Sequence, residues 1–158
     1  MRSKLLALLG ATVASGVLLF TTPAALAYSN TDSSSIPGSS DTIQANVWMS
    51  RDNGYGGFHW TSSAQLLGTD PYVAPWIEDQ WCASVAGIGV SIGGVSGSSG
   101  GSSVSETWTN TNNWISDLQG SIQLSNNLTW LYIHSDTTAI TEVNGNVVSA
   151  TAGVDDFG

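Results

Sequence analysis

The histidines are the first side chains in this chain that could do chemistry. His59 and His134 each lie in a strand-like stretch rich in aromatic residues. Two histidines beside carboxylates can bind a metal ion or activate a nucleophile. The spacings that usually accompany such sites, H-E-x-x-H, G-x-S-x-G and C-x-x-C, are missing. We therefore expect both histidines to be half-buried strand residues, and we predict no catalytic residue, no metal site and no cofactor.

Paired carboxylates are the second candidate chemistry, because two carboxyl groups across a cleft can hydrolyse glycosides. Adjacent acids occur at Glu78-Asp79 and Asp155-Asp156, but neighbours on a strand point to opposite faces, so neither pair forms a site alone. Glu78 or Asp79 together with Glu106 is the best non-local pair, since nearby tryptophans would raise a carboxyl pKa. Solvated acids in turns are the commoner alternative.

Cys82 is the only cysteine, so no intrachain disulfide can form and the core must hold the fold by itself. Its position between Trp81 and Ala83 indicates a small buried apolar side chain. The alternative is a reactive thiol or an intermolecular disulfide. No cation lies nearby in the sequence to lower the thiol pKa.

Seven tryptophans are more than one small core needs. We expect at least four of them to fill the core or cover its edges. The rest could stack on sugars or anchor a protein partner. The candidate aromatic face is made of Trp48, Tyr55, Trp60, Trp76, Trp81 and Trp108.

The first 27 residues resemble a secretory leader. A basic start with Arg2 and Lys4 precedes an apolar run over residues 5–20, and Ala25-Leu26-Ala27 ends the segment as an A-x-A cleavage site. We predict that residues 1–27 are a cleaved signal peptide and that the mature chain is extracellular. The apolar run is short for an uncleaved membrane span.

Removal of this leader would leave one basic side chain, Arg51, against twelve carboxylates, a formal charge of −11. A surface without lysine cannot neutralise phosphates, which excludes nucleic acid as an electrostatic partner. It also cannot dock on anionic lipid through a basic patch. Arg51 itself is expected to form a structural ion pair.

Residues 28–42 are Ser-rich and carry almost no apolar side chains. Such a stretch buries too little surface to offset its ordering entropy, so we predict a flexible arm. If the arm becomes ordered on a partner, Ile36 and Pro37 are the apolar residues that would contact it.

Residues 43–158 are predicted to form one all-β domain. Residues 43–50 alternate apolar and polar side chains, and Asn144-Gly145 between Val-rich arms indicates a type I′ hairpin. We expect strands over 55–60, 121–124 and 128–134, a loop over 66–75, a helical turn or strand over 76–83 and a helical turn over 114–118. About eight short strands predict an antiparallel β-sandwich or small barrel.

Residues 85–110 predict a β-hairpin with a long mobile tip. Ile88, Val90 and Ile92 fall on one face, a Gly/Ser run over 93–103 reverses the chain, and residues 104–109 alternate again. A membrane-inserting hairpin needs this apolar and polar alternation, although the apolar row is short and interrupted by glycine.

These features favour a secreted, non-catalytic β-sandwich that binds protein partners, as an adaptor in an extracellular or cell-surface assembly such as a toxin complex. The first alternative is a carbohydrate-binding module that uses exposed Trp and Tyr rings. The second is a membrane-inserting toxin that acts through the hairpin at 85–110.

Overall fold

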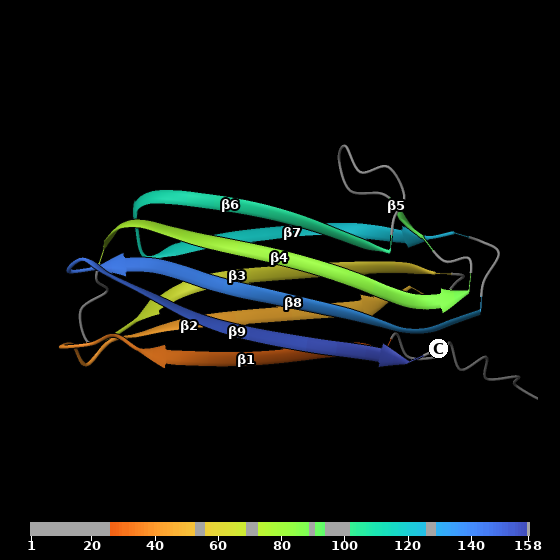
Figure 1. Ribbon diagram of the computed structural model, residues 1–158, viewed down its shortest axis with the longest axis horizontal. Helices are drawn as coiled ribbons and strands as arrows, with labels where there is room; N and C mark the ends of the chain where they lie inside the picture. Colours follow the sequence, from red (N-terminus) through yellow and green to blue (C-terminus); the bar gives the residue numbers. More distant parts are fainter. Residues whose placement is uncertain are drawn as a thin grey trace, which may run out of the picture.

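The chain folds into two antiparallel β-sheets packed face to face (Figure 1), which confirms the all-β prediction. The computed structural model describes residues 26–52, 56–68, 73–88, 91–93, 102–125 and 129–157. Sheet A has the strand order β1-β2-β3-β7-β5, and sheet B has the order β6-β4-β8-β9. The strands are β1 (Ala27–Ser35), β2 (Thr42–Arg51), β3 (Gly57–Leu67), β4 (Ala74–Ile88), β5 (Ile92–Gly93), β6 (Ser103–Asn113), β7 (Ile115–Leu124), β8 (Thr129–Val143) and β9 (Asn146–Phe157).

The core lies between the sheets and follows the alternation of the sequence. Ile43, Ala45, Val47 and Met49 all point inward from β2 and are at most 2% exposed, as the pattern over 43–50 predicts. Their polar neighbours point to the outer face of sheet A. The β2 pattern therefore fixes which face of sheet A meets solvent.

Two tryptophans join the sheets at the centre of the core. The rings of Trp60 on β3 and Trp81 on β4 stack with centroids 3.6 Å apart and planes 5° apart. Gly120 on β7 faces Trp60, and a Cβ at this position would lie 2.8 Å from the Trp60 ring. Glycine is therefore required here so that the indole can lie flat between the sheets.

The β8–β9 hairpin confirms the turn predicted at Asn144-Gly145. Both residues have positive φ, 52° and 78°, which a type I′ turn requires at its two central positions. The register runs from Val143 opposite Asn146 to Tyr132 opposite Phe157. The turn and the Val-rich arms together explain why the sequence predicted this hairpin correctly.

The flexible arm predicted for residues 28–42 is wrong over β1. Nine residues from Ala27 to Ser35 pair with β2 without a break in register. Ile36 is 2% exposed and belongs to the core, whereas Pro37 lies exposed in the following turn. A strand can form here because backbone pairing and distant side-chain contacts compensate for the scarcity of apolar residues.

Two other local predictions differ from the structure. Residues 114–118, predicted as a helical turn, form the bend at Trp114 and the start of β7. The loop predicted over 66–75 begins later and ends earlier, since β3 extends to Leu67 and β4 starts at Ala74. Residues 76–83, left open between helix and strand, lie in β4. Long strand ladders override these weak local preferences.

The hairpin predicted over 85–110 is only partly correct. β4 and β6 do pair antiparallel, from Ala74 opposite Asn113 to Ser84 opposite Ser103. However, β4 also pairs with β8, so it is a central strand of sheet B. Ile92 is 1% exposed and lies in β5 of the other sheet. Val90 and most of the Gly/Ser run lie outside the described residues, and no described helix is long and apolar enough to cross a membrane.

The two long sides of the sandwich differ. On one side, which we call the closed side, β1 of sheet A lies against β9 of sheet B (Figure 1). Arg51 donates to both carboxylate oxygens of Asp156 at 2.8 and 2.6 Å, and to the Phe157 carbonyl at 2.9 Å. Tyr28 donates to the same carboxylate at 2.8 Å, and Asn30 donates to the Gly153 carbonyl. The structural ion pair predicted for Arg51 is confirmed.

On the other side, which we call the open side, β6 ends sheet B, and the two-residue strand β5 is the only described strand that pairs with the outer edge of β7. Side-chain bonds connect these two strands next to the turn that joins them. Ser116 donates to the Trp108 carbonyl and Asn110 donates to the Ile115 carbonyl, both at 2.8 Å. No ion pair joins the described residues of β6 and β7.

Candidate functional site

The outer face of sheet A is a continuous polar surface across four strands. Strand register places its outward-facing side chains in rows that run across β1, β2, β3 and β7, and three of these rows concern the hollows. These three rows are Ser29, Trp48, Thr61 and Gln119; Thr31, Asn46, Ser63 and Asp117; and Ser33, Gln44, Gln65 and Ile115. Hydroxyl and amide groups therefore dominate the face, and one indole interrupts them.

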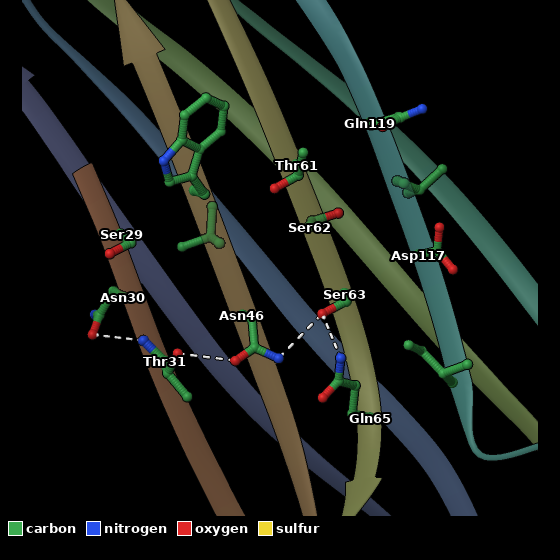
Figure 2. A pocket seen from close by; sticks show the side chains of 14 residues that line it. Ser29, Asn30, Thr31, Asn46, Thr61, Ser62, Ser63, Gln65, Asp117 and Gln119 are labelled. Atoms are coloured by element: carbon green, nitrogen blue, oxygen red, sulfur yellow. Dashed lines mark hydrogen bonds between the residues drawn. The ribbon is translucent and has the colours of Figure 1, made fainter. Parts of the chain in front are cut away.

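Hydrogen bonds connect the middle row into a chain (Figure 2). The Thr31 hydroxyl donates to the Asn46 side-chain oxygen at 2.9 Å, and the Asn46 amide donates to the Ser63 hydroxyl at 3.1 Å. Gln65 donates to the same hydroxyl at 3.4 Å. These bonds fix the orientation of the Asn46 amide, so that the row is pre-organised before any ligand arrives.

Two adjoining hollows, each of about 370 Å³, lie on this face. Both are lined by Trp48, Thr61 and Gln119, so the indole stands where they meet. The first extends over the middle row to Asp117 (Figure 2). The second extends toward His59. Trp48 is 36% exposed, which leaves part of its ring accessible to a ligand.

The charge of the hollows is neutral to acidic. Asp117 is the only carboxylate among their lining residues, and neither hollow is lined by lysine or arginine. His59, in the second hollow, lies 3.2 Å from the exposed Asp52 carboxylate. This surface therefore offers hydrogen-bonding groups and one aromatic ring, without a cation to bind an anionic group.

The structure does not gather the predicted aromatic face in one place. Trp60 and Trp81 are 1% exposed and stack in the core, so they cannot contact a ligand. Trp76 is half-buried on the outer face of sheet B, and Trp108 is 55% exposed at the open side. Tyr55 lies outside the described residues. Of the six candidates, Trp48 lines both hollows on sheet A and Trp60 lines the second, but of these two only Trp48 is exposed.

Of the predicted carboxylate combinations, only Asp79 shares the inner face of sheet B with Glu106. Glu78 points outward and bonds to Thr109, whereas Asp79 points into the core and is 0% exposed. Ser62 of sheet A donates to the Asp79 carboxylate at 2.7 Å. Burial raises the pKa of Asp79 to about 6, although this hydrogen bond opposes the shift. A carboxyl shielded from solvent between two sheets connects them but cannot reach a substrate.

The second histidine lies in an acidic setting on the outer face of sheet B. His134 Nδ1 is 2.8 Å from Asp155, and its Nε2 is 3.5 Å from Asp136. Cys82 pairs in register with Asp136, and its side chain is half-buried, whereas the sequence predicted a buried one. Burial, followed by the Asp136 charge, raises the pKa of the Cys82 thiol. The cysteine is therefore held as a thiol and not activated as a nucleophile.

Among the described residues, no cluster of three or more His, Cys, Asp or Glu side chains has the arrangement to hold a metal ion. No family model, curated protein or solved structure matches the chain. The functional argument therefore rests on the chemistry of its surfaces.

The sequence did not predict most of the residues that form the site on sheet A. The alternation over 43–50 already placed Gln44, Asn46 and Trp48 on one face. The polar partners on β1 and β7 were missed, because 28–42 was interpreted as a flexible arm and 114–118 as a helical turn. The missing signal is the pairing of β1 and β7 with β2 and β3, which places the rows side by side.

Proposed function

We propose that this chain is an exported, non-catalytic binding domain whose ligand is an uncharged carbohydrate chain, held on the outer face of sheet A. The observation that carries the proposal is the pre-organised row of Thr31, Asn46 and Ser63 beside the exposed ring of Trp48. Sugar hydroxyls need many donors and acceptors at fixed positions, and amide and hydroxyl side chains supply them.

The indole of Trp48 supports the same ligand class. The apolar C–H face of a pyranose ring packs on an aromatic side chain, while the sugar edges hydrogen-bond to polar neighbours. Thr61 and Gln119 flank this ring within both hollows. The volume of each hollow lies at the lower end of the range for small-molecule sites, about 300 to 1,000 Å³, so each holds one or two sugar units of a longer chain.

Charge argues for a neutral rather than an acidic glycan. The chain carries a formal charge of −9, and Asp117 lies in the first hollow. A uronate, sulfate or phosphate group would be repelled by this field and would find no lysine or arginine beside the hollows. Neutral hexose or pentose polymers avoid this cost.

Binding to a panel of neutral polysaccharides, such as xylan, mannan, mixed-linkage glucan and starch, tests the proposal by affinity electrophoresis and titration calorimetry. We expect Trp48→Ala to weaken binding about tenfold, which corresponds to about 1.4 kcal/mol of lost stacking. Trp108→Ala is the control, because it removes a more exposed indole at the open side, away from the hollows. Lack of binding across the panel, or equal losses in the two variants, would refute the proposal.

A further inference from the structure

Within the described residues, strand β6 has an unpaired outer backbone edge. It is the terminal strand of sheet B, and its only described partner is β4. The Val85 N–H donates to the Ser102 carbonyl at 2.8 Å, which identifies this pair as hydrogen-bonded. Because hydrogen-bonded and non-hydrogen-bonded pairs alternate in an antiparallel ladder, residues 104, 106 and 108 bond to β4. The backbone groups of Ser105, Thr107 and Thr109 therefore point away from the sheet.

Several of the usual protections of an exposed edge strand are missing from the described residues of β6. Native edge strands are generally shielded by lysine, proline, bulges, inward-pointing charges or a covering segment, and of these β6 has the half-buried carboxylate of Glu106. β6 has the sequence SVSETWTNTNN, with neither lysine nor proline, and its ladder with β4 runs from Ser103 to Asn113 without a bulge. Free N–H and C=O groups at regular spacing are the template on which an extended peptide adds as a further strand.

Side chains along the inner side of this edge indicate what such a strand would carry. The Glu106 carboxylate is half-buried and makes no hydrogen bond or ion pair with any described residue. Two positions further along the same face, Trp108 exposes 55% of its surface. A strand beside β6 would place alternate side chains opposite these two residues. Lysine or arginine there would neutralise Glu106 and pack over the Trp108 ring as a cation–π partner.

Charge also decides between a foreign segment and a second copy of this chain. The formal charge is −9, and the one described arginine, Arg51, is bound to Asp156 on the closed side. Antiparallel pairing of β6 with itself would bring two Glu106 carboxylates onto one face without a cation between them. Like charges across a strand pair are destabilising.

We propose that the outer edge of β6 binds an extended, basic segment of a partner protein by β-strand addition. This site is independent of the carbohydrate proposal, because it uses the edge of sheet B and not the outer face of sheet A. Strand addition at β6 would be the way in which the chain binds a protein partner, as the adaptor role expected from the sequence requires.

The probe is a blocked ten-residue peptide of alternating Lys and Thr, and the comparison peptide replaces every Lys with Glu. We expect the Lys–Thr peptide to bind, with weaker binding as salt rises, and the Glu–Thr peptide to bind at least tenfold more weakly. Glu106→Gln should weaken the Lys–Thr peptide about threefold. Equal affinity for both peptides would overturn the choice of a basic partner.

Thr107→Pro separates strand addition from simple charge attraction. Proline removes the outward N–H and blocks the edge without changing the charge or a bond to β4, so binding should fall at least tenfold. Thr107→Ala, which keeps the N–H, should bind as the wild type does. Unchanged binding by the proline variant would overturn the proposal.

Hydrogen exchange of the wild-type chain gives a second readout that needs no variant to fold. The Lys–Thr peptide should slow exchange at the amides of Ser105, Thr107 and Thr109, relative to the protein alone. A dimer in sedimentation experiments without peptide, with these amides already protected, would show that a second copy occupies the edge and would overturn the proposal. Lack of new protection at saturating peptide would overturn it as well.

Discussion

The closed and open sides of the sandwich differ in the partners of a buried carboxylate that lies between the two sheets. On the closed side, the buried carboxylate of Asp156 receives two bonds from Arg51 and one from Tyr28, so that β9 is fixed against β1 and β2. Toward the open side, the described hydrogen-bond partners of the buried Asp79 carboxylate are both hydroxyls, Ser62 at 2.7 Å and Thr137 at 3.4 Å. The two sides therefore differ by one arginine. An ion pair holds the strands together on the closed side, whereas the terminal strand of sheet B on the open side keeps an unpaired outer edge among the described residues.

Arg51→Met should have the largest effect on this contrast. It leaves the Asp156 carboxylate, which is 1% exposed, without its cation. Removing one partner of a buried ion pair is strongly destabilising, so we expect a loss of about 3 kcal/mol in the free energy of unfolding. Chemical denaturation at neutral pH measures it.

The double variant with Asp156→Asn is the control for that experiment. An amide in place of the carboxylate removes the unpaired charge, so the arginine substitution should cost clearly less in this background. Equal costs in the two backgrounds would mean that the ion pair does not lock the closed side.

Asp79→Asn tests the carboxylate that has no cation. Because the folded-state pKa is about 6 against an ordinary value of 3.8, the unfolded chain ionises first as pH rises. Burial of Asp79 therefore costs nothing below about pH 4 and up to about 3 kcal/mol above about pH 6. The asparagine variant avoids this cost.

Unfolding free energies of wild type and Asp79→Asn at several pH values provide the measurement. The stability of the variant relative to the wild type should increase as pH rises from about 4 to about 7. A difference that stays constant over this range would show that Asp79 ionises as freely in the folded protein as in the unfolded chain.

Tyr28→Phe is expected to weaken the closed side more modestly. It removes one hydrogen bond to Asp156 while Arg51 remains, so the free energy of unfolding should fall by about 1 kcal/mol. The bond to this carboxylate also raises the pKa of Tyr28. Tyr132→Phe is the matched control, since Tyr132 makes no described hydrogen bond, and thermal denaturation should show no change for it.

Thr107→Pro should have the smallest effect on stability, because the lost N–H points away from β4. We expect a change within about 1 kcal/mol, as for other substitutions on edge strands. Glu106→Pro, one residue earlier, removes an N–H that bonds to β4 and should cost about 3 kcal/mol. Similar costs at the two positions would contradict the assignment of the outer edge.

Local sequence signals predicted those parts of the fold in which neighbouring residues determine the structure. Alternation set the faces of β2, and Asn144-Gly145 set the β8–β9 turn because type I′ geometry needs positive φ at both positions. The ion pair of Arg51 was predictable from the scarcity of other cations.

Long-range contacts determine the rest, and no short pattern carries them. β1 is a strand because it pairs with β2 and because Tyr28 and Asn30 contact β9, more than 120 residues away. Trp48 and Trp60 lie on neighbouring strands, yet the first faces solvent and the second stacks on Trp81. Which tryptophan is exposed depends on strand register, which aromatic content alone does not reveal.

Residue-resolved hydrogen exchange of the free protein tests the asymmetry of the two sides most directly. Our account predicts that amides of residues 104, 106 and 108 are protected through their bonds to β4, while those of Ser105, Thr107 and Thr109 exchange rapidly. β1 should show the same alternation between bonded and free amides, with slow exchange near Arg51 and Asp156 where the closed side is locked. Uniform protection along β6 in a monomeric sample would contradict the account, since the open edge would then already be covered.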